Sequence, residues 1–415
     1  MIAHILPSAL SGCVRAPASK SAAHRALICA ALSEGETEIL CPGSNADIEA
    51  TLRCLTGISA SCERTESGFV IRGGKAAGEA AVDCGESGST LRFLIPVAAA
   101  LGTQCDFYCA GRLPQRPLDG LRETLAANGV SLSAPGENPV RVRGGFGGSR
   151  FTLPGNISSQ FVSGLLFALP LLPNGGEIRI EGPLSSANYV EMTLQALKQF
   201  GISVTRTPEG FSLPGGCRYK TPGRLSIEGD WSGAAFWLCA GQAVSGLSAH
   251  SAQGDRAILD VLARMGAEID RTEDTVSARG ALCGTVVDAD PIPDLVPPIA
   301  AAAVHAAGET RIVNAARLRD KESDRLRTTA AALNALGARV EELPDGLIIS
   351  GGKPLTGGTC DSCGDHRIAM AAAVGALRAE GESHILGAEC VAKSYPGFWR
   401  DLARLGGRVT LEEGA

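Results

Sequence analysis

The segment LRCLTGISASCERTESGFVIRGG, residues 52–74, carries the pattern that decides the fold. It reads as an amphipathic helix, a glycine, a short strand, a turn and a second strand. The same order occurs six times along the chain, with 65 to 72 residues between successive marker glycines. A repeat of this length is too long for a solenoid and predicts a small α/β module present six times. The other copies are LAANGVSLSAPGENPVRVRGG (125–145), LKQFGISVTRTPEGFSL (197–213), LARMGAEIDRTEDTVSARG (262–280), LNALGARVEELPDGLIISGG (333–352) and the shorter LARLGGRVTLEEG (402–414).

Each marker glycine occupies the position at which a helix must end before a strand begins. Glycine tolerates the left-handed backbone conformation that closes many helices, so we expect a left-handed C-cap at each of these positions. The marker glycines are Gly57, Gly129, Gly201, Gly266, Gly337 and Gly406.

A second set of six segments alternates with the first. These segments are apolar nearly all round, which predicts helices buried inside a domain. They begin with polar residues, and a helix start offers unpaired N–H groups and a positive dipole end to an anion. Taken singly, each start is explained by ordinary N-capping. The segments are SKSAAHRALICAAL (19–32), SGSTLRFLIPVAAAL (87–101), SSQFVSGLLFALPLL (158–172), DWSGAAFWLCAGQA (230–243), PDLVPPIAAAAVHAA (293–307) and GDHRIAMAAAVGAL (364–377).

Composition limits the function classes. The 415 residues are 45% apolar and 20% charged, which is typical of two or three globular domains with large cores. A net charge of -6 argues against a nucleic-acid binder held by bulk charge. We expect no membrane span and no leader segment, reduced thiols at the 14 cysteines, and a cytoplasmic location.

Charged and polar residues gather at the starts of the apolar segments, where they could bind an anionic ligand. Without the repeat, a string such as RDKESDR (319–325) would be interpreted as a solvated helix face with internal ion pairs. With the repeat, we favour a shared anion-binding cleft. The candidates are Lys20, Ser21, Arg25, Gly88, Ser89, Arg92, Arg116, Ser158, Ser159, Gln160, Asp294, Lys321, Glu322, Arg325, Asp365, His366, Arg367 and Lys393.

Two other kinds of site are less well supported. Cys360 and Cys363 form a CxxC near His366, but a structural zinc site needs four ligands and the sequence has no matching second pair. The chain also has no GxxxxGK[ST], so a P-loop kinase is not indicated. We therefore expect neither a metal nor an organic cofactor at the site.

Nine motifs in register resemble the 5-enolpyruvylshikimate-3-phosphate (EPSP) synthase family over essentially the whole chain. They are SKSxxxR from Ser19, ESGSTLR from Glu86, QRP from Gln115, SSQF from Ser158, GDxS from Gly229, PD from Pro293, KESDR from Lys321, DHR from Asp365 and AKSYPGF from Ala392.

The resemblance implies a two-domain inside-out α/β barrel of the enolpyruvyl transferase type, with three modules per domain. It implies an N-terminal lobe over residues 19–228 and a C-terminal lobe made of residues 1–18 and 229–415. The chain would cross between the lobes near residues 18–20 and 228–230, and the active site would lie in the cleft between them.

The resemblance also implies a reaction and its site residues. The enolpyruvyl group of phosphoenolpyruvate would move to the 5-hydroxyl of shikimate 3-phosphate through a tetrahedral intermediate, with release of phosphate. Phosphoenolpyruvate would be bound by Lys20, Gly88, Arg116, Gln160, Arg325, Arg367 and Lys393. Shikimate 3-phosphate would be bound by Lys20, Ser21, Arg25, Ser158, Ser159, Gln160, Ser186, Tyr189, Asp294 and Lys321. Proton transfer would fall to Asp294, Glu322, Lys20 and Lys393.

Such an enzyme is expected to be a monomer that binds small molecules and neither nucleic acid nor membrane. Two alternatives compete with it. The sister family, UDP-N-acetylglucosamine enolpyruvyl transferase, carries a reactive cysteine where this chain has the cysteine-free loop AGRLPQRPLDG, residues 110–120. A non-catalytic anion-binding homologue would be expected to have lost some catalytic side chains, yet all of them are present. Two departures from the family pattern are Glu86, a negative charge near the expected phosphoenolpyruvate pocket, and Phe93, where several members have proline.

Overall fold

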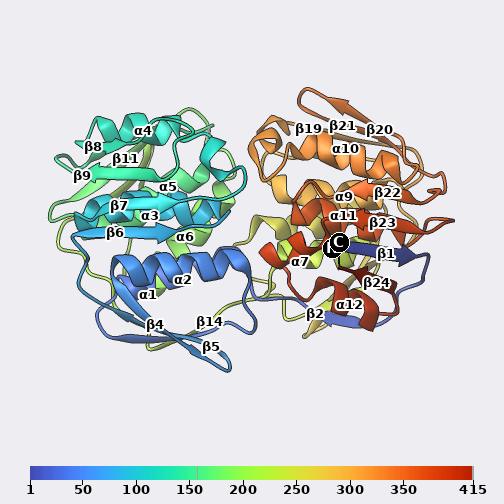
Figure 1. Ribbon diagram of the computed structural model, residues 1–415, viewed down its shortest axis with the longest axis horizontal. Helices are drawn as coiled ribbons and strands as arrows, with labels where there is room; N and C mark the ends of the chain where they lie inside the picture. Colours follow the sequence, from blue (N-terminus) through green and yellow to red (C-terminus); the bar gives the residue numbers. More distant parts are fainter. Residues whose placement is uncertain (157, 414–415) are drawn as a thin grey trace. The chain divides into compact units, whose positions relative to one another are not determined.

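The computed structural model describes residues 1–156 and 158–413 and divides into two compact units (Figure 1). The continuous unit is Lys20–Ile227, and the split unit combines Met1–Ser19 with the chain from Glu228 onward. Within the described ranges, no helix is both long enough and apolar enough to cross a membrane.

The continuous unit contains three four-stranded sheets, in the orders β14-β3-β5-β4, β6-β7-β9-β8 and β10-β11-β13-β12. Its strands are β3 (Glu36–Leu40), β4 (Ala60–Thr65), β5 (Gly68–Gly73), β6 (Glu79–Asp83), β7 (Gln104–Tyr108), β8 (Val130–Leu132), β9 (Val140–Gly144), β10 (Arg150–Pro154), β11 (Gly175–Glu181), β12 (Thr205–Thr207), β13 (Gly210–Pro214) and β14 (Arg224–Ser226). Its helices are α1 (Lys20–Ala31), α2 (Ala46–Ile58), α3 (Gly88–Leu101), α4 (Asp119–Ala126), α5 (Ser159–Ala168) and α6 (Ala187–Gln199), with short 3-10 turns η1 (Leu113–Gln115) and η2 (Leu169–Leu171).

The split unit repeats this plan, with sheets β16-β17-β15-β2, β18-β19-β21-β20 and β22-β23-β1-β24. Its strands are β1 (Ile2–Leu6), β2 (Cys13–Arg15), β15 (Ala243–Ser245), β16 (Glu268–Arg271), β17 (Thr275–Arg279), β18 (Val286–Asp288), β19 (Glu309–Val313), β20 (Val340–Leu343), β21 (Gly346–Ser350), β22 (Gly358–Asp361), β23 (Ser383–Leu386) and β24 (Arg408–Glu412). Its helices are α7 (Trp231–Cys239), α8 (Ile258–Arg264), α9 (Val296–Ala303), α10 (Arg325–Ala335), α11 (His366–Ala376) and α12 (Phe398–Arg404), with 3-10 turns η3 (Gly254–Ala257), η4 (Pro293–Leu295), η5 (Ala316–Asp320) and η6 (Ala388–Lys393).

Each sheet combines one parallel pair with antiparallel neighbours. In the module of β6 to β9, β6 and β7 are parallel and α3 crosses between them, while β9 pairs antiparallel with β7 and β8. Three modules are completed by distant strands, because β14 pairs parallel with β3, β2 pairs parallel with β15, and β1 pairs antiparallel with β23 and β24. The six-module α/β expectation is therefore confirmed.

The six apolar segments form the buried helices α1, α3, α5, α7, α9 and α11. Every residue of α9 and α11 is buried, and these two helices pack against each other and against α7 (Figure 1). In the continuous unit, α3 packs against α5 in the same way. The apolar composition all round these helices follows from this placement, since each has neighbours on every side.

The marker glycines follow the prediction at five of six positions. Gly129, Gly201, Gly266, Gly337 and Gly406 have φ between +79° and +99°, the left-handed region. The prediction for Gly57 is wrong, because Gly57 lies inside α2 and the helix is capped at Ser59. A Cβ on Gly57 would lie 2.6 Å from Cγ1 of Val82, so this glycine permits close packing of the helix on β6.

Candidate functional site

The split unit gathers six of its charged side chains into a carboxylate–arginine cluster: Asp294, Lys321, Glu322, Arg325, Asp365 and Arg367. They lie where three helices begin. Asp294 is in η4, directly before α9, while Arg325 is the first residue of α10 and Arg367 the second residue of α11. These helix starts bring together charged residues that are up to 73 positions apart in the sequence.

Arg325 lies at the centre of this cluster and contacts three carboxylates. Its Nε donates to Asp365 Oδ2 at 2.8 Å and its Nη1 donates to Asp294 Oδ1 at 2.8 Å. Its Nη2 donates to Glu322 Oε2 at 2.6 Å. The side chain is 1% exposed. Burial alone would lower the pKa of Arg325, but the three carboxylates outweigh burial and raise it, so this residue is a permanent cation.

Asp294 is held as a carboxylate by its cationic neighbours. Arg367 Nη2 donates to Asp294 Oδ2 at 3.0 Å, and Lys321 Nζ lies 3.8 Å from Oδ1. Burial alone would raise the pKa of Asp294, but Arg367, Lys321 and Arg325 hold it well below its usual range. The side chain keeps 20% exposure, so a ligand could reach it. In this state Asp294 stays ionised at neutral pH and is a weak base.

Asp365 was a candidate for the cleft but was not assigned to either substrate, although it anchors the cluster. It is fully buried, it caps α11 by accepting from the Arg367 backbone N at 3.0 Å, and it accepts from Ser323 Oγ at 3.0 Å. Its position before a buried apolar helix in GDHR was the available signal. Lys393 is buried at the end of η6, which packs against α11.

Asp255, in η3, is a second titratable group that sequence reasoning missed. It is 2% exposed and accepts a hydrogen bond from Ser232 Oγ. Burial raises the pKa of Asp255 to about 7, helped by the negative charge of Asp294 and opposed by Arg367. The sequence gives no local sign of this, because the effect depends on tertiary burial.

Replacing Asp255 with Asn should change how stability depends on pH. The folded pKa of about 7 lies above the unfolded value of 3.8, so between these pH values the native state holds a proton that the unfolded chain has lost. Native stability therefore falls as pH rises through this window. Asp255→Asn removes this contribution, so the variant should gain up to about 1.4 kcal/mol per pH unit relative to the parent chain.

The measurement is urea unfolding at several pH values between 5 and 6.5. All three tryptophans, Trp231, Trp237 and Trp399, belong to the split unit and report its unfolding by fluorescence. Asp270→Asn, at an exposed position of β16, is the matched control. Parallel curves for Asp255→Asn and the parent would contradict the raised pKa.

The continuous unit places Lys20 at the first position of α1, where its Nζ donates to Asp47 Oδ2 at 2.8 Å. Lys20 and Asp47 are 14% and 7% exposed, so the ammonium group is fixed by a largely buried carboxylate in the first turn of α2. Asp47 was not predicted, and no motif marks it. The pair holds a lysine in place at a helix start, where an anion is also favoured.

A second group in the continuous unit surrounds the start of α3. Arg92 Nη1 donates to Gln160 Oε1 at 2.9 Å, and Gln160 Nε2 donates to Ser89 Oγ at 2.9 Å. A Cβ on Gly88 would lie 2.7 Å from Arg116 Nη1 and 3.1 Å from Arg92 Nη1. The absent side chain therefore lets two guanidinium groups approach the helix start. Arg92 orients the Gln160 amide, a role that the sequence did not indicate.

Arg25 joins α1 to α6. Its Nη2 donates to the Tyr189 carbonyl at 2.8 Å and its Nε donates to Thr193 Oγ1 at 2.9 Å, with the side chain 3% exposed. Burial lowers the pKa of Arg25 to about 10, and the residue remains cationic at neutral pH. Next to Tyr189, Ser186 has φ 52°, a left-handed conformation that costs a non-glycine residue about 1–3 kcal/mol and is often found at ligand sites.

The remaining expected ligands also lie at helix starts. Ser21 is in the first turn of α1, Ser158 caps α5 by accepting from the Gln160 N at 3.3 Å, and Ser159 begins that helix. Glu86 is exposed, and its carboxylate lies against Gly111. Most of the expected residues of each unit thus lie at or near helix starts, whereas Arg116 follows η1 and Lys393 ends η6.

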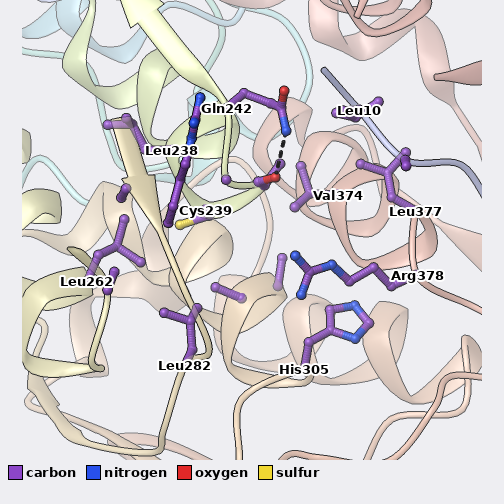
Figure 2. Close-up of a pocket in the computed structure, with 18 of the residues that line it drawn as sticks. Leu10, Leu238, Cys239, Gln242, Leu262, Leu282, His305, Val374, Leu377 and Arg378 are labelled. Atoms are coloured by element: carbon purple, nitrogen blue, oxygen red, sulfur yellow. Dashed lines mark hydrogen bonds between the residues drawn. The ribbon is translucent and has the colours of Figure 1, made fainter. Parts of the chain in front are cut away.

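A cavity of about 630 Å³ lies at the opposite ends of the buried helices in the split unit (Figure 2). It is lined by the ends of α7, α9 and α11, with Leu238, Leu262 and Leu377 among its apolar residues and with His305 and Arg378 as polar ones. The expected site residues are not among those that line it. The cavity is therefore separate from the residues expected to carry the chemistry.

Comparison with known proteins identifies the family. Residues 6–402 match the family model described as EPSP synthase (3-phosphoshikimate 1-carboxyvinyltransferase). A 3-phosphoshikimate 1-carboxyvinyltransferase of Clostridium acetobutylicum is 44% identical over 98% of this chain and 97% of that protein. A solved EPSP synthase structure from Acinetobacter baumannii has a TM-score of 0.82 and 27% identity, and covers 99% of this chain and 100% of its own.

The fold extends to a more distant relative. The enolpyruvyl transferase NikO of Streptomyces tendae has a TM-score of 0.78 at 18% identity, with 100% of this chain and 99% of that chain covered, and shows a shared fold alone. The family model and the close relatives together settle the assignment: this chain belongs to the EPSP synthase family of enolpyruvyl transferases.

Proposed function

We propose that this chain transfers the enolpyruvyl group of phosphoenolpyruvate to the 5-hydroxyl of shikimate 3-phosphate and releases phosphate. The observation that carries the proposal is the arrangement of Asp294, Glu322, Arg325 and Arg367 in direct contact at three helix starts. A family member that had lost its activity would have no need to retain this buried charged arrangement, which is costly to desolvate.

In this proposal, each of the two units contributes some of the residues that bind the substrates. The two substrates together carry two phosphates and two carboxylates, so bringing them together requires fixed cations and helix dipoles. Lys20, Arg25, Arg116 and Gln160 come from the continuous unit, and the carboxylate–arginine cluster with Lys393 comes from the split unit. We propose that the substrates bind between these two groups and that binding draws the groups together.

Asp294 is the proposed base for the 5-hydroxyl. Its lowered pKa makes it a weak base while Arg367, Lys321 and Arg325 all compensate its charge. A substrate phosphate or carboxylate that engages those cations would reduce this compensation and raise the basicity of Asp294 as the reactants meet. Glu322, Lys20 and Lys393 are the candidates for moving the proton at C3 of the enolpyruvyl group and the proton on the departing phosphate.

The test is a phosphate-release assay on the purified chain, treated with EDTA and supplied with both substrates. Phosphate should appear only when shikimate 3-phosphate and phosphoenolpyruvate are present together. Replacing shikimate 3-phosphate with UDP-N-acetylglucosamine tests the sister activity. Release from the UDP sugar, or none from the proposed pair, would refute the proposal.

We place this reaction in the cytoplasm and expect a monomer. The chain carries 14 free cysteines, including Cys29, whose thiol pKa burial raises above its usual value. Such thiols persist in a reducing compartment. Sedimentation equilibrium of the purified chain would test this expectation, since a dimer would give twice the molecular mass of the monomer.

A further inference from the structure

Two histidines and two glutamates meet on one face of the terminal sheet of the split unit, away from the residues discussed above. His4 in β1 lies directly opposite His384 in β23, and it lies opposite Thr410 in β24. Glu382 is two residues before His384, and Glu412 is two residues after Thr410. Side chains two residues apart on a strand share a face, so all four point to the same side. The neighbouring Ala3 and Ile5 point into the core.

The ligand atoms are spaced closely enough for one metal ion. His4 Nδ1 and His384 Nδ1 are 2.9 Å apart, and His4 Nδ1 lies 3.7 Å from Glu382 Oε1. One ligand atom from each of His4, Glu382 and His384 lies within 4.8 Å of the other two. Ligands of tetrahedral zinc, bound at about 2.0–2.2 Å, lie about 3.3 Å from one another, so small changes in the three side chains would bring their ligand atoms to this spacing. Water would take the fourth position, as it does in zinc sites with three protein ligands.

The fourth residue orients the first histidine. Glu412 Oε2 lies 2.9 Å from His4 Nε2, so the carboxylate accepts a hydrogen bond from Nε2–H. The proton therefore stays on Nε2, and the lone pair of Nδ1 is directed at His384 and Glu382. A carboxylate that holds one ring nitrogen while the other binds a metal is the common arrangement around zinc. Without a metal, the short contact between the two Nδ1 atoms requires a proton on His384 Nδ1. A metal would replace that hydrogen bond once His384 moved its proton to Nε2.

We propose that His4, His384 and Glu382 bind a zinc-class divalent cation, with Glu412 as the positioning residue. Imidazole nitrogen suits Zn²⁺ and Ni²⁺, whereas Mg²⁺ and Ca²⁺ prefer sites made of oxygen ligands. The ion would connect β1 to β23 directly and to β24 through Glu412. It would therefore tie the first strand of the chain to two strands from its end, and its role would be to stabilise the split unit.

The experiment titrates ZnCl₂ into the metal-free full chain by calorimetry and follows the midpoint of thermal unfolding. Zn²⁺ should raise the midpoint, because it binds the native chain in preference to the unfolded one, and Mg²⁺ should not. Loss of an outer partner typically weakens metal affinity 10- to 100-fold, so Glu412→Gln should weaken zinc binding about tenfold. His4→Ala and His384→Ala remove ligands and should weaken it by more than about 100-fold.

The controls separate this site from other zinc-binding groups. His250→Ala removes an exposed histidine of the same unit and should bind zinc as the parent does. Exposed thiols such as Cys363 could also bind the ion, so Co²⁺ is used as a spectroscopic probe. The Co²⁺ absorption that the parent shows and that His4→Ala and His384→Ala lose should contain no thiolate charge-transfer band. Unchanged zinc affinity in both variants, or a thiolate band from the lost site, would overturn the proposal. Enzyme activity is not the readout, and EDTA should leave it intact.

Discussion

Asp294→Ala should lower turnover at least about 100-fold, and by as much as about 10⁴-fold, while the chain stays folded. In the proposed reaction, Asp294 accepts the proton of the attacking hydroxyl. Asp365 cannot readily take over, because it is fully buried whereas Asp294 is 20% exposed, and Glu322 is assigned to a different proton in this proposal. Single-turnover phosphate release, with both substrates saturating, measures the chemical step without the contribution of binding.

A conservative variant and a control make this test specific. Asp294→Asn keeps an oxygen that can accept from Arg325 or Arg367, but it cannot act as a base at neutral pH. It should be as inactive as Asp294→Ala. Asp270→Ala, an exposed aspartate of the same unit, should turn over normally. If Asp294→Asn retained near-normal turnover, Asp294 would have a positioning role and the base would have to be another residue.

The module pattern was predictable from sequence because it depends on local chemistry. Apolar residues all round a helix predict burial, and the six segments chosen on that criterion are the six buried helices. Gly57 is a position at which the local sequence pattern gave the wrong prediction. A glycine before a strand is equally compatible with a left-handed cap and with a close helix contact, and only the position of Val82 decides between them.

The pairing with distant strands that completes three modules could not be derived from local patterns. Pairing of β14 with β3, of β2 with β15, and of β1 with β23 and β24 joins segments that lie far apart in the sequence. The expectation of chain crossings near these strands came from the resemblance to a known family. Periodicity gave the number of modules, and it gave no information on which distant strand completes each sheet.

Candidate site residues could be chosen from the sequence where a motif marks them, and their contact partners were missed where tertiary contact creates the role. Lys20, Asp294 and Arg325 each lie in a motif at a helix start. Asp47 and Asp255 are ordinary acidic residues in sequence. Their roles arise from contact with Lys20 and from burial near Asp294, so no local pattern could reveal them.

The largest effect on stability is expected from Arg325→Met, which should destabilise the split unit by about 3–5 kcal/mol. The substitution preserves much of the side-chain volume and removes the charge. It leaves Asp294, Glu322 and Asp365 without the cation that all three contact, in a place where Arg325 itself is only 1% exposed. Water cannot easily replace the lost partner for Asp365, which is fully buried.

The expected loss can be measured by urea unfolding followed by tryptophan fluorescence, since every tryptophan lies in the split unit. Arg311→Met is the matched control, because Arg311 and Glu309 form an exposed pair and such pairs contribute less than about 1 kcal/mol. Arg325→Lys should fall between the two, since one ammonium group cannot reproduce the planar fork that reaches three carboxylates. If Arg325→Met were as stable as Arg311→Met, Arg325 would not be the residue that offsets the cost of burying these carboxylates.

The pH dependence of this loss distinguishes electrostatic repulsion from a simple packing defect. If the carboxylates that have lost Arg325 cause the destabilisation, protonating them relieves it, so the difference between Arg325→Met and the parent should be smaller at pH 5 than at pH 7. A packing defect would give the same difference at both values, because no charge takes part in it. The comparison therefore tests whether the carboxylate–arginine cluster is held together by charge, which the proposed activation of Asp294 by an arriving anion requires.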